Sequence, residues 1–267
     1  MDLGFLKEFG MENNPHFVSA TDFFAGLSPD ERVFWLIRHS IRRHITPEDS
    51  DNGAHVGLTD EGRALAINLG KLFPEGSTVY FSSPVGRCLD TAKCIEEGRL
   101  LAGRTPATKP DVDFTAGSAL VKPTDDAGLM AVASEIAALK TEGSAVAPVD
   151  CLGDFYVKDY DAYLGVLNEH FYQNICDWVN SDNHPAFFPL SSRAQELREF
   201  MLALGTARFN IFATHDCWVV PTLMHFCGFR FTPSHWMNFL TGLAFVEGPR
   251  GERIVPVTGM DTGFQDF

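Results

Sequence analysis

Three short stretches of the chain contain residue types that can bind and transfer an anionic group. Residues 38–40 read Arg-His-Ser and Arg42 follows closely, while Arg87 and the His-Asp pair at 215–216 come much further along. Guanidinium groups make charge-assisted, often bidentate hydrogen bonds to phosphate oxygens, and a neutral imidazole beside them can act as a nucleophile. If these residues meet in the fold, they form a pocket that suits a phosphoryl group.

Each stretch follows, directly or within a few residues, an apolar run that predicts a β-strand. The segment "VFWLI" (33–37) is continuously apolar, as expected for a strand that is covered on both faces. The segments "STVYFSSP" (77–84) and "FNIFATHD" (209–216) also predict strands. Because helical patterns alternate with them, we expect a mainly parallel sheet, whose strands end along one shared edge. The three stretches would then meet at that edge.

The helical patterns between these strands are amphipathic. In "LTDEGRALAINLGKLF", Thr59 can cap a helix and Leu65, Leu69 and Leu72 recur at helical spacing. A second helix is predicted over 85–98, ending near Gly98, and its N-terminus would add backbone N–H groups to the anion pocket. Further helices are predicted over 192–205 and over "WVVPTLMHFCGF" (218–229).

These elements predict an α/β fold in which a mainly parallel sheet has helices on both faces. We expect the core to comprise residues 1–103 and 190–267. Residues 104–189 are predicted to form a helical cap or insertion, with helical patterns near 128–140 and 159–180 separated by a loop containing "CLGDFYVKD". The terminal segment "LAFVEGPRGERIVPV" predicts an antiparallel hairpin, and Pro256 suggests that it lies at a sheet edge.

Composition argues against polyanionic partners. The chain of 267 residues has 21 basic and 35 acidic residues, a net charge of −14 that opposes binding to nucleic acid or to anionic membranes. No apolar stretch is long enough to span a bilayer, and the N-terminus does not resemble a secretory signal. The six cysteines show no CxxC pairing, so reduced, mostly buried thiols in a cytoplasmic protein are expected.

Four motifs, in this order, resemble the histidine phosphatase superfamily, which includes phosphoglycerate mutases, acid phosphatases and phytases. They are "RHSIRR", "LTDEGRALAINLG", "SSPVGRCLDTA" and "THDCWVVPTLMHFCG". The resemblance covers roughly residues 33–98 and 192–228 and leaves the middle of the chain unassigned. It implies a phosphoglycerate mutase-like fold and a phosphomonoester or inorganic phosphate as the small-molecule partner, with no metal or other cofactor.

The resemblance also implies roles for individual residues. His39 would be the nucleophile that forms a phosphohistidine, and the phosphoryl oxygens would be bound by Arg38, Arg42, Arg87 and His215. The acid phosphatase and phytase branch has His-Asp in the last motif, where the mutase-like branch usually has glycine after the histidine. Asp216 would therefore donate a proton to the leaving group and later act as a base toward water.

The first motif of the family usually reads Arg-His-Gly, and Ser40 stands here in place of the glycine whose carbonyl orients the imidazole. Ser40, Arg43 and Trp218 are further candidates for substrate contacts. Carboxylates of the predicted cap, namely Asp154, Asp161 and Glu169, are rivals to Asp216 as the acid.

Other interpretations of the same residues stay open. An arginine after a strand is most often solvated or part of a salt bridge, and only the convergence of several favours a site. A phosphomutase would use the same phosphohistidine, and a phospholigand-binding protein would have weak activity. A metal hydrolase would use His39, His44, His215 and Asp216 as ligands. The sequence indicates neither the natural substrate nor the oligomeric state.

Overall fold

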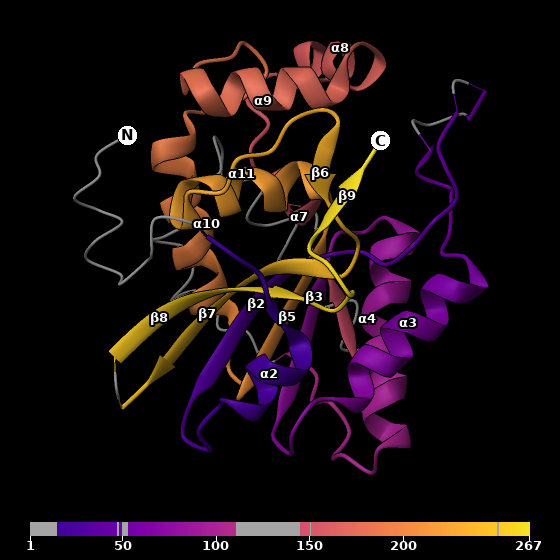
Figure 1. Ribbon diagram of the computed structural model, residues 1–267, viewed down its shortest axis with the longest axis vertical. Helices are drawn as coiled ribbons and strands as arrows, with labels where there is room; N and C mark the ends of the chain where they lie inside the picture. Colours follow the sequence, from indigo (N-terminus) through magenta and orange to yellow (C-terminus); the bar gives the residue numbers. More distant parts are fainter. Residues whose placement is uncertain (1–14, 47, 50–52, 111–144, 150, 250) are drawn as a thin grey trace.

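The computed structural model of the chain describes residues 15–46, 48–49, 53–110, 145–149, 151–249 and 251–267 (Figure 1). At its centre is a seven-stranded sheet with the order β1-β8-β7-β2-β5-β3-β4, in which only β7 runs antiparallel to its neighbours. The strands are β1 (Val18–Ser19), β2 (Arg32–Arg38), β3 (Thr78–Ser82), β4 (Val146–Pro148), β5 (Phe209–Thr214), β7 (Thr241–Gly248) and β8 (Gly251–Thr258). This confirms the predicted mainly parallel sheet.

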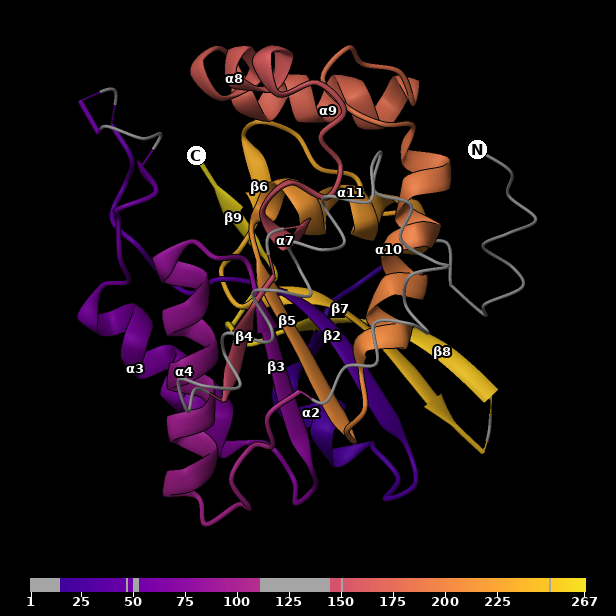
Figure 2. The ribbon, with the colours of Figure 1, turned by 180° about the vertical axis from the view of Figure 1, so that it is seen from behind.

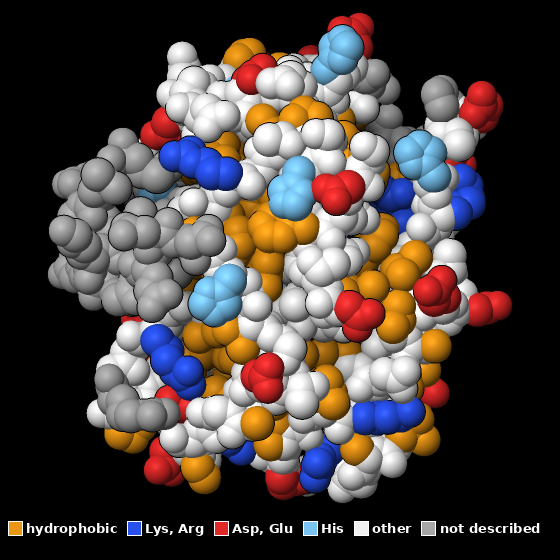
Figure 3. Space-filling view, in the orientation of Figure 1, with side chains coloured by type: hydrophobic (Ala, Val, Ile, Leu, Met, Phe, Trp, Pro, Cys, Tyr) orange, Lys and Arg blue, Asp and Glu red, His pale blue; other side chains and the backbone are white. Residues whose placement is uncertain are grey.

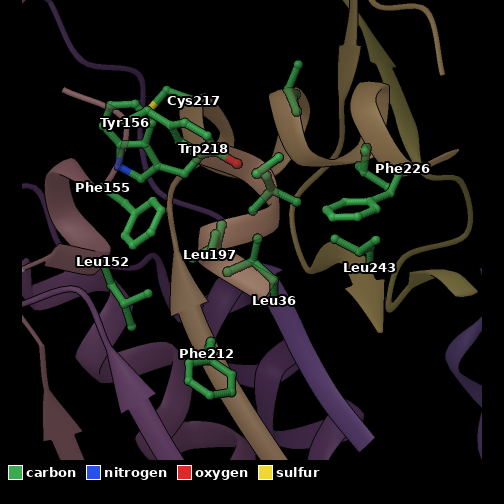
Figure 4. Packing of buried hydrophobic residues seen from close by; sticks show 14 of the residues in the cluster. Leu36, Leu152, Phe155, Tyr156, Leu197, Phe212, Cys217, Trp218, Phe226 and Leu243 are labelled. Carbon is green, nitrogen blue, oxygen red and sulfur yellow. The ribbon is translucent and has the colours of Figure 1, made fainter. Parts of the chain in front are cut away.

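Helices cover both faces of the sheet, and each face has its own apolar core. On β2, Phe34 and Leu36 pack with α10 (Leu190–Leu204) and α11 (Asp216–Cys227). The alternate residues of β2 pack on the opposite face with α2 (Ala20–Ala25), α3 (Asp60–Lys71) and α4 (Gly86–Leu101). Successive side chains of a strand point to opposite faces, so a strand buried on both sides reads as one apolar run. Figures 2 and 4 show the first of these faces, where α10 lies on the sheet and Leu197 packs above Leu36.

Helix α3 has the predicted start, whereas α4 does not end where the sequence suggests. Thr59 accepts a hydrogen bond from the N–H of Gly62, which confirms the predicted cap. Helix α4 continues past Gly98, so the predicted end there is wrong. A Cβ on Gly98 would lie 1.9 Å from the carbonyl oxygen of Ile67 in α3, and one on Gly70 would lie 2.0 Å from that of Ile95 in α4. Gly98 therefore allows two helix backbones to touch.

The range predicted as a helical cap contains both helices and a strand. The pattern near 159–180 forms α8 (Tyr160–Asn168) and α9 (Phe171–Ser181), which lie at the same end of the molecule as α11 (Figure 1). The pattern near 128–140 lies outside the described residues. The predicted loop starts with the short helix α7 (Cys151–Asp154), and β4 pairs with β3 in the main sheet. At three residues, β4 is too short to give a recognisable pattern.

The predicted C-terminal hairpin is formed by β7 and β8. Strand β8 is not the outermost strand, because β1 pairs with its last two residues, Val257 and Thr258. Within the described residues, Pro256 lies in the part of β8 that has a strand partner on one side only. A second, two-stranded sheet is made by β6 (His235–Met237) and β9 (Phe264–Asp266).

The described side chains also bear on the expectations from composition. Cys88, Cys94, Cys176, Cys217 and Cys227 are free and buried, as expected for reduced thiols. On the face seen in Figure 3, Lys and Arg side chains are dispersed among Asp and Glu. No helix in the described part of the chain is long and apolar enough to cross a bilayer.

We expect Gly98→Ala to lower the free energy of unfolding by about 1–3 kcal/mol, because the added methyl group would overlap a backbone carbonyl of α3. At an open helix position the same change stabilises by up to about 1 kcal/mol, since alanine has the higher helix propensity. Urea denaturation followed by circular dichroism measures the difference. Gly165→Ala in α8 is the matched control, because a Cβ there would meet no atom within 4 Å. Equal effects of both changes would contradict the close helix crossing.

Candidate active site

The ends of three adjacent parallel strands bring the predicted site residues together. In the sheet register, Arg38 at the end of β2 lies beside Thr214 of β5, and Ser82 at the end of β3 lies beside Ala213. The ladder continues one residue further, where the N–H of His39 donates to the carbonyl of Thr214 at 2.9 Å. Helices α4 and α11 then start at this edge. Arg38, His39, Arg87, His215 and Asp216, far apart in sequence, converge there as predicted.

Arg87 lies between two buried imidazoles. Its Nε–H donates to Nε2 of His39 at 3.3 Å, and its Nη2 lies 3.4 Å from Nδ1 of His215. Its Nη1 donates to the carbonyl of Gly53 at 2.8 Å. Because a guanidinium can only donate, each imidazole nitrogen that faces Arg87 must be an unprotonated acceptor. The arrangement therefore requires both histidines to be neutral.

The orientation of His39 is fixed from its other ring nitrogen. Nδ1 of His39 lies 2.8 Å from the carbonyl oxygen of Ser40, so Nδ1 carries the proton and Nε2 keeps its lone pair. Burial, followed by the charges of Arg87 and Arg38, lowers the pKa of His39 well below its usual value. A buried imidazole with a free lone pair toward the pocket is suited to nucleophilic attack.

Ser40 stands where the motif that the sequence resembles has glycine, and its carbonyl still contacts the imidazole of His39. Its N–H donates to Oγ1 of Thr91 at 2.9 Å, and its hydroxyl donates to the carbonyl of Gly62 at 2.7 Å. The hydroxyl of Thr91 in turn donates to the carbonyl of Arg87 at 2.8 Å. Ser40 is fully buried, so in this structure it positions His39 and does not face a substrate.

His215 is held by β3 as well as by Arg87. Its Nε2 lies 3.0 Å from Oγ of Ser83, which can accept the ring proton while Nδ1 accepts from Arg87. Burial and the charge of Arg87 lower the pKa of His215 to about 3. At neutral pH the side chain is an uncharged donor and acceptor that lies between the ends of two strands.

Asp216 is the only acid among these groups, and it is paired. Its Oδ2 lies 2.9 Å from Nη2 of Arg38 and accepts a hydrogen bond from Nε1 of Trp236 at 3.0 Å. Burial alone would raise the pKa of the Asp216 carboxyl, but the charges of Arg38 and Arg42 outweigh it and hold the pKa below its usual range. Without a bound anion, Asp216 is therefore a carboxylate.

The site has a net positive charge that a bound anion would balance. With both histidines neutral, three guanidinium groups face one carboxylate, which leaves a net charge of +2. Among the described residues, Nε of Arg38 and Nε of Arg42 are buried and have no hydrogen-bond partner. Helix α4 begins at Gly86, shortly after β3 ends at this edge, and no side chain caps its N-terminus, so the positive end of the helix dipole adds to the positive charge here. A phosphate dianion would match both the charge and the donors.

Two of the residues predicted to contact substrate, Arg43 and Trp218, make other contacts in the structure. Arg43 is exposed and forms a two-pronged ion pair with Asp49, so for this residue the ordinary surface interpretation applies. Trp218 is 1% exposed, lies in the core, and donates its indole N–H to the carbonyl of Gly153 at 2.8 Å (Figure 4). The rival acids of the cap, Asp154, Asp161 and Glu169, are exposed.

Sequence reasoning missed three aromatic residues around the site. The ring of Phe239 lies 4.1 Å from Cζ of Arg38 and 5.8 Å from the ring of His39. Trp236 donates to Asp216, and its ring lies 4.9 Å from that of Tyr172 in α9. These residues come from the C-terminal segment and the cap, where no motif was visible, so no sequence signal pointed to them.

The described residues contain no group of three or more His, Cys, Asp or Glu side chains arranged to hold a metal ion. Of the four ligands that a metal hydrolase would use, His44 is exposed whereas His39, His215 and Asp216 are buried beside arginines.

Comparison with known proteins gives distant structural similarities only. No protein-family model matches the chain. No curated protein matches it either. Among solved structures, a mycobacterial protein named hydrolase 2 is 13% identical, with a TM-score of 0.44 and coverage of 87% of this chain and 92% of that one. A mycobacterial glucosyl-3-phosphoglycerate phosphatase is 12% identical, with a TM-score of 0.41 and coverage of 87% and 98%. A phosphoglycerate mutase from Bacillus anthracis is 14% identical, with a TM-score of 0.41 and coverage of 85% and 93%. At such low similarity, the activity of this chain has to be inferred from its own residues.

The low pKa of His215 predicts a pH-dependent stability. In the unfolded chain the imidazole takes up a proton below pH 6.5, but in the folded protein it does so only near pH 3, so the free energy of unfolding falls as the pH drops through this window. Between pH 7.5 and 4.5 we expect His215 to account for a loss of about 3 kcal/mol. Urea denaturation in phosphate-free buffer measures it. His215→Asn should lose correspondingly less stability over this range, and equal losses in both proteins would contradict the assignment.

Proposed function

We propose that the protein is a metal-independent phosphomonoester hydrolase that works through a phosphohistidine on His39. The observation that carries this proposal is the position of Arg87. It donates to the lone pair of a neutral, buried His39, and the opposite nitrogen of the same ring is tied to the carbonyl of Ser40. The proposed nucleophile and a guanidinium group therefore lie beside each other, where both could contact a bound phosphoryl group. The resemblance of the four sequence motifs to histidine phosphatases supports the same role.

Binding of a phosphomonoester dianion would balance the local charge. The buried Nε atoms of Arg38 and Arg42 would donate to phosphoryl oxygens, and Arg87 would turn its Nε–H from His39 to the phosphate. Such donors stabilise the charge on the equatorial oxygens in the transition state of phosphoryl transfer. His215, held by Ser83, would supply one more hydrogen bond.

In the first step, the lone pair of His39 Nε2 forms a bond to phosphorus while the bond from phosphorus to the ester oxygen breaks. The positive charge that develops on the imidazole is stabilised through the Nδ1–H bond to the carbonyl of Ser40. Asp216, protonated in the complex, gives its proton to the leaving alkoxide. In the second step, the Asp216 carboxylate takes a proton from water, the water oxygen bonds to phosphorus, and the N–P bond breaks. Inorganic phosphate and neutral His39 result.

Substrate binding itself would prepare Asp216 for the first step. Arg38 and Arg42 hold the pKa of the carboxyl below its usual range against the opposing effect of burial. A phosphate dianion would share these guanidinium groups and add negative charge nearby, and both effects raise the pKa of Asp216. The acid would then be protonated when a leaving group is present.

We expect His39→Ala to abolish phosphate release from a panel of phosphomonoesters that the wild-type protein hydrolyses in the presence of a chelator, because the variant cannot form the intermediate. Acid-labile, base-stable labelling of the wild-type protein by a ³²P-phosphomonoester would trap the phosphohistidine directly. His44→Ala removes an exposed histidine of the same loop and should retain activity. Equal release by wild type and His39→Ala would refute the mechanism, while labelling without release would favour the phosphomutase.

Asp216→Asn should affect the leaving group selectively. A general acid contributes on the order of 10²–10⁴-fold, so we expect a loss of this size with glycerol phosphate, whose alkoxide needs a proton. With p-nitrophenyl phosphate, whose leaving group is stable as an anion, the loss should be much smaller. Steady-state kcat/KM values for both substrates measure the effect, because kcat/KM reports formation of the phosphohistidine and not its hydrolysis, in which Asp216 also acts. A uniform loss in kcat/KM would argue against Asp216 as the acid.

A further inference from the structure

We propose that Trp236 is a positioning residue for Asp216, which holds the carboxyl group in place for proton transfer to the leaving group. This inference rests on the proposed function. The indole N–H of Trp236 donates to Oδ2 of Asp216 at 3.0 Å, and the backbone N–H of Cys217 donates to Oδ1 at 3.0 Å. The two carboxyl oxygens are therefore each fixed by a donor that does not belong to the anion pocket.

The hydrogen bond from Trp236 differs in kind from the one made by Arg38. Both donate to Oδ2, but the guanidinium of Arg38 is also a predicted phosphate ligand and would be shared with a bound anion. An indole N–H is a donor only and carries no charge, so it can bond either the carboxylate or the neutral acid and cannot compete for the proton. Trp236 would therefore keep Asp216 oriented in both protonation states.

Trp236 is itself held rigidly. It is fully buried in β6, where it pairs with Gln265 of β9, and the next carbonyl, that of Met237, accepts a hydrogen bond from Nη1 of Arg38. Its ring packs edge-on against Tyr172 of α9, with 4.9 Å between centroids. The small β6–β9 sheet thus contacts both members of the Arg38–Asp216 ion pair, and α9 packs against the residue that orients the acid.

Other groups also act on the charge of Asp216, and a test must separate their effects from that of Trp236. Arg38, Arg42 and His215 favour the carboxylate, and burial opposes it. Further titratable groups in the described part of the chain also interact with Asp216, namely Cys88, Tyr163, Tyr172 and Cys217. Removal of the Trp236 donor leaves all of these in place.

The experiment is Trp236→Phe, which keeps an aromatic ring in the core and removes the N–H. We expect kcat/KM for glycerol phosphate to fall about 10-fold while kcat/KM for p-nitrophenyl phosphate changes less than about 2-fold, because only the first substrate needs the acid to form the phosphohistidine. Loss of a donor to the carboxylate also raises the pKa of Asp216, so the basic limb of the kcat profile for glycerol phosphate should move up by about one pH unit.

Trp178→Phe is the matched control. Trp178 is equally buried, but its indole N–H donates to the carbonyl of Phe188 at 3.0 Å, so its loss should leave both the substrate ratio and the basic limb unchanged. A second readout is the double variant with Asp216→Asn, in which Trp236→Phe should cause little further loss, since its effect passes through Asp216.

The outcomes distinguish the two proposals. If wild-type protein releases no phosphate, or if Asp216→Asn shows no leaving-group selectivity, the proposed function fails and the role of Trp236 fails with it. If both of those tests succeed but Trp236→Phe lowers kcat/KM equally for both substrates with an unmoved basic limb, only the positioning role is overturned. An additive loss in the double variant would overturn it as well, because it would indicate a purely structural contribution.

Discussion

The contact of Arg87 with two neutral imidazoles is the interaction on which the rest of the site depends. Hydrogen-bond partners lower the cost of burying a guanidinium group, and Arg87 has three of them, namely His39, His215 and the carbonyl of Gly53. The same charge opposes protonation of both histidines, so one arrangement provides partners for the arginine and keeps His39, the proposed nucleophile, uncharged. As a result, the site carries a net positive charge, and this charge would favour the binding of a phosphate dianion.

This arrangement requires the helices of one face to pack closely against the strand ends. A Cβ on Gly62 would lie 2.2 Å from the carbonyl oxygen of Ile41, so the start of α3 packs directly on the loop that carries the nucleophile. Through Gly62 and Thr91, Ser40 is tied to α3 and α4, and its carbonyl is thereby placed against His39. The glycine contact between α3 and α4 sets the distance between these two supports. Helix packing away from the site thus contributes to the orientation of His39, the proposed nucleophile.

Asp216, the proposed acid, is placed by a different part of the chain. Asp216 follows β5, but its hydrogen-bond partners are Arg38 at the end of β2 and Trp236 in the C-terminal segment. Just beyond Trp236, Phe239 stacks on Arg38, and the adjacent Leu240 has a positive φ of 49° that turns the chain into β7. The ends of parallel strands supply the groups proposed to bind the anion, whereas the segment that leads into the antiparallel strand supplies the surroundings of the proposed acid. The proposed phosphate-binding groups and the surroundings of the proposed acid therefore come from separate elements.

The sequence by itself determined the α/β class, the central strands, the cap of α3 by Thr59, and the convergence of five polar residues at one sheet edge. These features depend on local periodicity and on the rule that parallel strands share their direction, and both are visible in a single chain. Only the tertiary structure decided the end of α4, the assignment of β4 to the sheet, the burial of Trp218 and the approach of Trp236 to Asp216. Gly98 has the residue type of a helix end, but contact with another helix makes it an interior position. Trp236 belongs to no motif, because its role arises from packing between segments that no local pattern relates.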